Sequence, residues 1–76
     1  MATVEQIKAA RALLSWSQED LAACSGLSLP TVRRFEGRSK LRVSDDARLK
    51  IEAALESAGI EFTNNDALGV RLHKKK

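Results

Sequence analysis

The sequence predicts a mainly α-helical domain of 76 residues that ends in two short β-strands. Two observations predict the helices. Apolar residues recur at helical spacing, and each expected helix follows a Ser or Thr that can cap it. The strands are predicted by alternating apolar and polar residues within 60–62 and 70–72. We therefore expect a helical domain over 1–59, followed by a β-strand extension with a basic tail over 60–76.

The first expected helix spans 4–14 and begins after Thr3, which has capping-box spacing to Gln6. Trp16 follows in a short connection, and we expect its ring to cover the packing of the first helix against the second. The buried face of the first helix is expected to be formed by Ile7, Ala10 and Leu14.

The next segment predicts a helix, a tight turn and a second helix, with the helices over 18–24 and 29–36. Gly26 supplies the positive φ that a sharp turn needs, and Ser28 can cap the second helix. Gly37 is expected to end that helix in a left-handed conformation. This arrangement is a helix-turn-helix.

The segment contains Gln18, Leu21, Ala22, Gly26, Ser28, Val32 and a Phe35-Glu36-Gly37 end. With these residues it resembles the helix-turn-helix of phage Cro/repressor-type (XRE-like) DNA-binding proteins. The resemblance implies a four-helix, lambda-repressor-like domain, and its wider extent covers residues 3–58. In that family, an arginine at the position of Arg11 pairs with the glutamate that ends the recognition helix, here Glu36. The alternative is two unrelated surface charges.

The resemblance also implies the DNA contacts, with the second helix of the motif in the major groove. The charge of this region also favours DNA binding, because 33–42 holds five Arg or Lys and one acid. A solvated charged face is the alternative. Arg34 can bond guanine in a bidentate manner. The expected base contacts are Leu29, Pro30, Thr31, Arg33 and Arg34. The expected phosphate contacts are Gln18, Ser28, Arg38, Lys40 and Arg42.

A fourth helix is expected after Ser44 and should end at Gly59. Leu49 lies off its apolar stripe, so it is either exposed or in contact with a partner. The stripe itself is formed by Ile51, Ala54, Leu55 and Ala58.

The two C-terminal strands are too short to be stable alone, so they must pack on the helices or pair with a second molecule. We expect them to pair with the same strands of a second copy and to form a homodimer. The alternative is a hairpin within one chain, with dimerisation through the fourth helix and Leu49. The expected dimerisation residues are Ile60, Phe62, Val70 and Leu72.

Composition argues against several other functions. His73 is the single histidine and Cys24 the single cysteine, so we expect no catalytic residues, no metal site and no cofactor. Cys24 is expected to be a small filler residue. One Trp and no Tyr argue against stacking on single strands. No apolar run is long enough to span a membrane, so a cytoplasmic protein is expected.

The sequence thus predicts a transcription regulator of the XRE family that binds a double-stranded DNA operator as a homodimer. A regulatory protein partner is a further possibility that the sequence leaves open. The alternative function is an antitoxin-like or anti-regulator module on the same fold, whose main partner is a protein. An enzyme is not expected.

Overall fold

The computed structural model describes residues 2–37, 44–64 and 68–73. It confirms a mainly α-helical domain with a C-terminal β-hairpin. The elements are α1 (Val4–Leu14), α2 (Gln18–Ser25), α3 (Leu29–Glu36), α4 (Asp45–Ser57), β1 (Ile60–Asn64) and β2 (Leu68–Leu72).

Each helix begins at a hydroxyl side chain that accepts a hydrogen bond from a backbone N–H of the first turn. Gly59, with a φ of 105°, follows the end of α4 as expected. The expectation for Gly37 is wrong, because its φ of −85° and ψ of 178° are extended. The chain therefore leaves α3 directly, without a left-handed cap. The four capping residues are Thr3, Ser17, Ser28 and Ser44.

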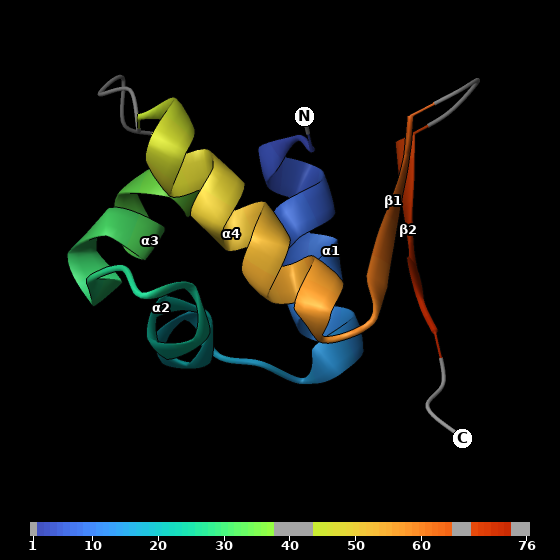
Figure 1. The fold of residues 1–76 in the computed structure, drawn as a ribbon, viewed down its shortest axis with the longest axis horizontal. Helices are drawn as coiled ribbons and strands as arrows, with labels where there is room; N and C mark the ends of the chain where they lie inside the picture. The colour runs from blue at the N-terminus through green and yellow to red at the C-terminus, as the bar shows by residue number, and fades with distance from the viewer. Residues whose placement is uncertain (1, 38–43, 65–67, 74–76) are drawn as a thin grey trace.

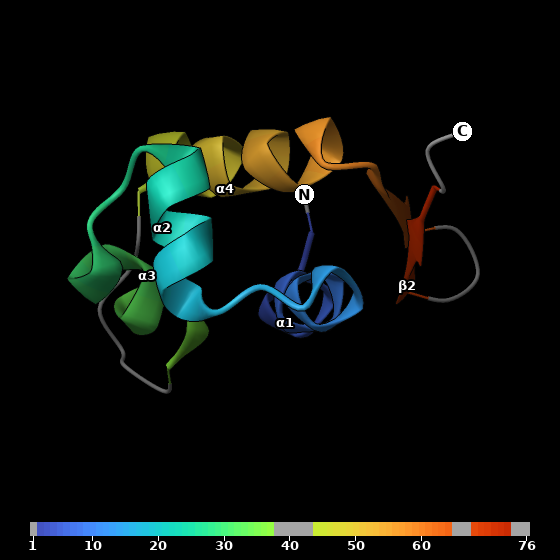
Figure 2. The ribbon, with the colours of Figure 1, turned by 90° about the horizontal axis from the view of Figure 1, so that it is seen from below.

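The helices and the hairpin are arranged along the longest axis of the molecule. In Figure 1, α2 and α3 lie at one end, α4 and α1 lie in the middle, and the hairpin lies at the other end. Figure 2 shows the same order from below. Side chains from all four helices form one core, to which Ile60 of β1 is added. The largest fully buried side chains are Ile7, Leu21, Val32, Ile51 and Leu55.

The hairpin is antiparallel and forms within one chain, with Phe62 opposite Val70 and Ile60 opposite Leu72. The structure therefore has the hairpin within one chain that was the alternative expectation, and pairing with a second copy stays a prediction. Ile60 is buried, and Phe62 and Val70 pack against the core. Because one face of the hairpin lies on α1 and α4, its apolar side chains find contacts in their own domain.

Gln6 attaches the hairpin to the N-terminus of α1. Its side chain is buried, and Oε1 accepts a hydrogen bond of 2.9 Å from the N–H of Thr3. Nε2 donates to the carbonyl of Thr63 at 3.2 Å and to that of Gly69 at 2.9 Å. One amide thus completes a capping box and holds both strands. The sequence predicted the first role and missed the second.

The outer face of the hairpin carries a cluster of charges. Glu61 accepts a hydrogen bond of 2.6 Å from Arg71 and lies 2.6 Å from Nε2 of His73. Hydrogen bonds from Arg71 and then from His73 lower the pKa of Glu61 below its ordinary value. The cluster is exposed to solvent, so its contribution to stability is small. Its consequence is that Arg71 has an acidic neighbour within its own chain.

We predict that Gln6→Glu lowers the free energy of unfolding by about 1–3 kcal/mol, measured by urea denaturation. The new carboxylate still accepts from Thr3, but at neutral pH it has no N–H for the carbonyls of Thr63 and Gly69. Asp20→Ala gives a comparison, because it removes a capping-box partner from α2 and leaves the hairpin intact. A Gln6→Glu variant of unchanged stability would show that the hairpin contact contributes nothing.

Candidate nucleic-acid interface

The turn between α2 and α3 sets the direction in which α3 leaves. Gly26 has a φ of 74°, and the N–H of Leu27 bonds the carbonyl of Ala22 at 3.1 Å. A Cβ on Gly26 would meet no atom within 4 Å, so backbone conformation selects glycine there. Ser28 then caps α3 by accepting from the N–H of Thr31. The helix-turn-helix expected from the sequence is present.

Two arginines lie on the exposed side of α3, while the opposite side of the helix is buried. Val32 and Phe35 belong to the core, whereas Arg33 and Arg34 are exposed. Neither arginine forms an ion pair with any residue in the described part of the chain. Pro30, near the start of the helix, is also exposed. This face of α3 therefore offers two unpaired guanidinium groups and a small apolar ring.

Leu29 and Thr31, which were expected to contact bases, are less accessible than Arg33 and Arg34. Leu29 is half-buried and packs against the core. Thr31 is half-buried, and its hydroxyl lies 2.8 Å from that of Ser28. Both side chains therefore have structural contacts that the sequence prediction did not include. The expected phosphate contacts Arg38, Lys40 and Arg42 lie outside the described residues.

Arg11 and Glu36 form the expected pair, and it is a buried pair. Nε of Arg11 donates to Oε2 of Glu36 at 2.8 Å, and Nη2 donates to Oε1 at 2.7 Å. The Glu36 side chain is 2% exposed and that of Arg11 is 20% exposed. The hydrogen bond to Glu36 is the largest cause of the raised pKa of Arg11. Two parallel N–H donors fix the orientation as well as the distance of α3 relative to α1.

The same carboxylate also reaches α2. Nε2 of Gln18 donates to Oε1 of Glu36 at 3.2 Å, and Nη1 of Arg11 donates to the carbonyl of Trp16 at 2.9 Å. We call these four residues the Glu36 cluster. It joins α1, α2, α3 and the connection before α2. Gln18, expected to contact phosphate, is thus already held by α3 through one of its two amide hydrogens.

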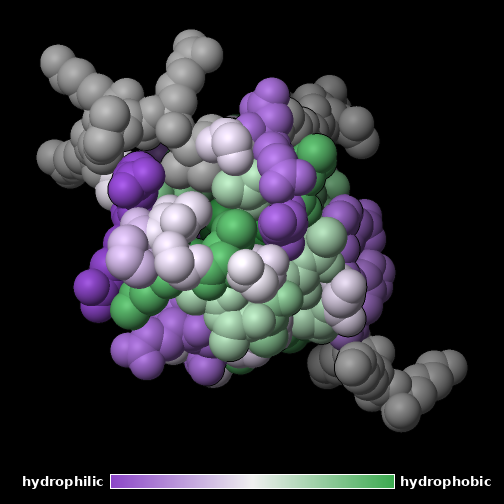
Figure 3. Space-filling view, turned by 60° about the vertical axis from the view of Figure 1, so that its left-hand side comes forward, coloured by the Kyte–Doolittle hydropathy of each residue, from purple (hydrophilic) through white to green (hydrophobic). Residues whose placement is uncertain are grey.

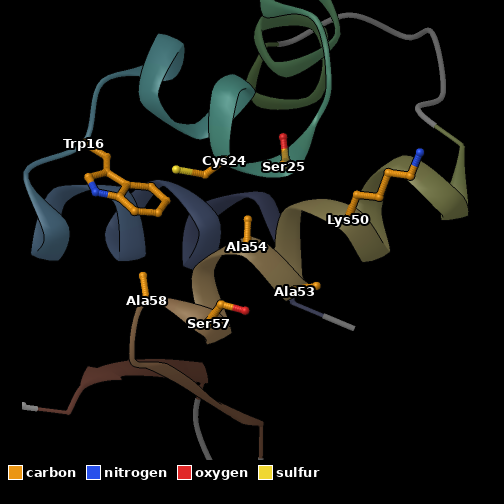
Figure 4. A pocket seen from close by; sticks show the side chains of 8 residues that line it. All are labelled: Trp16, Cys24, Ser25, Lys50, Ala53, Ala54, Ser57 and Ala58. Carbon is orange, nitrogen blue, oxygen red and sulfur yellow. The ribbon is translucent and has the colours of Figure 1, made fainter.

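A second surface feature is an open groove between α2 and α4, with a volume of about 510 Å³ (Figure 4). Trp16 lies at one end and Lys50 at the other, where Nζ is 3.4 Å from Asp46. The expectation that Cys24 fills the interior is wrong, because it is exposed and lines this groove beside Trp16. In the view that brings the α2 and α3 side forward, apolar residues occupy the middle and hydrophilic residues surround them (Figure 3).

Two other features, a metal site and a membrane-spanning helix, were sought in the described residues. Within 2–37, 44–64 and 68–73, no group of three or more His, Cys, Asp or Glu residues could hold a metal ion. The helices in these ranges are too short and too polar to cross a membrane. Neither the models of known protein families nor the curated proteins include a match to this chain. The candidate interface therefore depends on the geometry of α3 and the Glu36 cluster.

We predict that Glu36→Ala lowers the free energy of unfolding by about 3 kcal/mol, because it leaves the largely buried Arg11 without its carboxylate. Thermal or urea denaturation would measure the loss. Glu56→Ala, which removes an exposed carboxylate from α4, is the control and should change stability by no more than about 0.5 kcal/mol. A Glu36→Ala variant of full stability would contradict the structural role of the pair.

Proposed function

We propose that the protein is a sequence-specific, double-stranded DNA-binding transcription regulator of the XRE-like type that acts as a homodimer. The observation that carries the proposal is the pair of exposed arginines on α3, which have no ion-pair partner among the described residues and behind which the Glu36 cluster fixes the helix. A rigid helix with cations on its outer face suits a helix that enters the major groove. The proposal includes no catalytic residue, metal or cofactor, and it implies a cytoplasmic protein.

Base recognition is assigned first to the exposed residues of α3. Arg34 bonds O6 and N7 of a guanine in a bidentate manner. Arg33 lies about 100° further round the helix and contacts a neighbouring base or a phosphate. Pro30 has no side-chain donor, so it makes an apolar contact with a thymine methyl group. Leu29 and Thr31 are half-buried, so only the exposed parts of their side chains are assigned to base contacts.

Phosphate contacts are assigned to groups that flank α3. Gln18 begins α2, where backbone N–H groups and the helix dipole favour an anion. Glu36 accepts one of its two amide hydrogens, and no acceptor among the described residues takes the other. Ser28 caps α3 from an exposed position. The segment after α3 adds three basic residues, which are Arg38, Lys40 and Arg42.

The alternative function is an antitoxin-like or anti-regulator module that binds a protein. The groove between α2 and α4 is the observation that favours it, because Trp16 and neighbouring small side chains are open to a partner there. A regulatory protein that binds this groove is also compatible with DNA binding, since none of the described residues that line the groove belongs to α3.

The decisive experiment is the binding of purified protein to random and selected duplex DNA at several salt concentrations. Each phosphate contact contributes roughly −0.9 to the slope of log affinity against log salt concentration. A DNA-reading protein gives a negative slope and prefers the selected duplex. Absence of any complex at low salt would reject DNA binding in favour of the protein-binding alternative.

We predict that Arg34→Ala reduces the preference for selected over random DNA by about 1–3 kcal/mol, because the bidentate contact is lost. Lys50→Ala is the matched control, since it removes an exposed cation from α4. It should leave the ratio of the two affinities unchanged. An unchanged ratio in Arg34→Ala would remove this arginine from the base contacts.

A further inference from the structure

We propose that the outer edge of β2 binds β2 of a second copy in antiparallel orientation, with Val70 on the two-fold axis. The two hairpins then form one four-stranded sheet, in which the strands follow the order β1, β2, β2 and β1. This inference deepens the proposed function, since it assigns the surface of the proposed homodimer. It does not depend on DNA binding.

The hydrogen-bond pattern of the hairpin shows which backbone groups face outward. The N–H of His73 bonds the carbonyl of Gly59 at 2.9 Å, so this pair faces inward. Directly opposite pairs alternate along an antiparallel ladder. The register then turns the N–H and C=O groups of 68, 70 and 72 away from β1. None of these three residues makes a backbone hydrogen bond to another element within the described ranges. This edge is an unpaired template for another strand.

Exposed apolar side chains gather along the same edge. Leu68 is 60% exposed and Leu72 is 38% exposed, although both belong to the face that packs on the helices. Ala9 of α1 lines a small cavity with Leu68 and Val70. Leu13, which is 46% exposed, lies one helical turn after Ala9 on the same side of α1. Leu68 and Leu72 thus place exposed apolar side chains on the strand that has the open edge.

The sequence of β2 is self-complementary about Val70. A two-fold axis at that residue places Leu68 opposite Leu72 of the second copy, and Val70 opposite its own counterpart. All of these residues have outward-facing backbone groups, so about six interchain hydrogen bonds form without disturbing either hairpin. The three apolar pairs extend the face that already covers α1. A register shifted by one residue would bring inward-facing backbone groups to the interface.

Charge also favours this register. The two-fold axis places Arg71 opposite Gly69 of the second copy, so the arginines of the two copies do not face each other directly. Arg71 is already paired with Glu61 of its own chain at 2.6 Å. Direct opposition of like charges would destabilise a sheet. The register that aligns the leucines therefore also avoids that repulsion.

The test compares single and paired charge substitutions by measuring molecular mass in solution over a range of protein concentrations. Leu68→Lys and Leu72→Lys each appear twice in the dimer and should each raise its dissociation constant at least about 100-fold. The double variant L68E/L72K places opposite charges across the interface and should restore dimerisation. The double variant L68K/L72K should remain monomeric. Within one chain, positions 68 and 72 are about 13 Å apart, so the rescue requires a second copy.

Circular dichroism and thermal unfolding show whether each variant keeps its fold, as expected for substitutions at exposed positions. Leu49→Lys, at an exposed leucine of α4, is the control and should leave the dimer intact. The proposal would be overturned if the native protein were monomeric. It would also be overturned if Leu49→Lys were monomeric while Leu68→Lys remained dimeric. Failure of L68E/L72K to restore the dimer would overturn it as well. Loss of DNA binding in a protein that still dimerises would instead reject the proposed function.

Discussion

The buried carboxylate of Glu36 is the interaction on which the arrangement of the first three helices depends. A carboxylate removed from water is costly unless hydrogen bonds satisfy it. Arg11 supplies two of these bonds and Gln18 supplies a third, each from a different helix. Because the three donors converge on two oxygen atoms, α3 cannot rotate or slide without breaking a charged contact. The residues behind α3 thus determine how its outer face is presented.

Much of the fold could be predicted from the sequence because its signals are local. A capping residue, a helical period and a glycine with positive φ each act within a few residues. Gly37 was predicted wrongly, since the path of the chain after α3, and not the residue type, decides its φ. The second role of Gln6 joins carbonyls 57 and 63 residues away in sequence, which no local pattern records.

The candidate site was predictable to a similar extent. Arg11 and Glu36 were identified through a family resemblance, and the structure adds that their contact is buried and shared with Gln18. Arg33 and Arg34 are exposed, whereas Leu29 packs against the core and Thr31 lies 2.8 Å from the hydroxyl of Ser28, contacts that the sequence prediction did not include. The two strands were predicted, but the sequence left open whether they pair within one chain or with a second copy, because alternating residues indicate a strand without selecting its partner.

The hairpin and α3 occupy opposite ends of a molecule whose longest extent is 36 Å. In a dimer joined at the edges of β2, the two-fold axis runs perpendicular to the four-stranded sheet, so the helices of both copies lie on the same face of that sheet. Both α3 helices then lie at the end of the assembly that is remote from the sheet. Such a dimer would approach an operator with two half-sites from one side of the duplex, with the sheet turned away from the DNA.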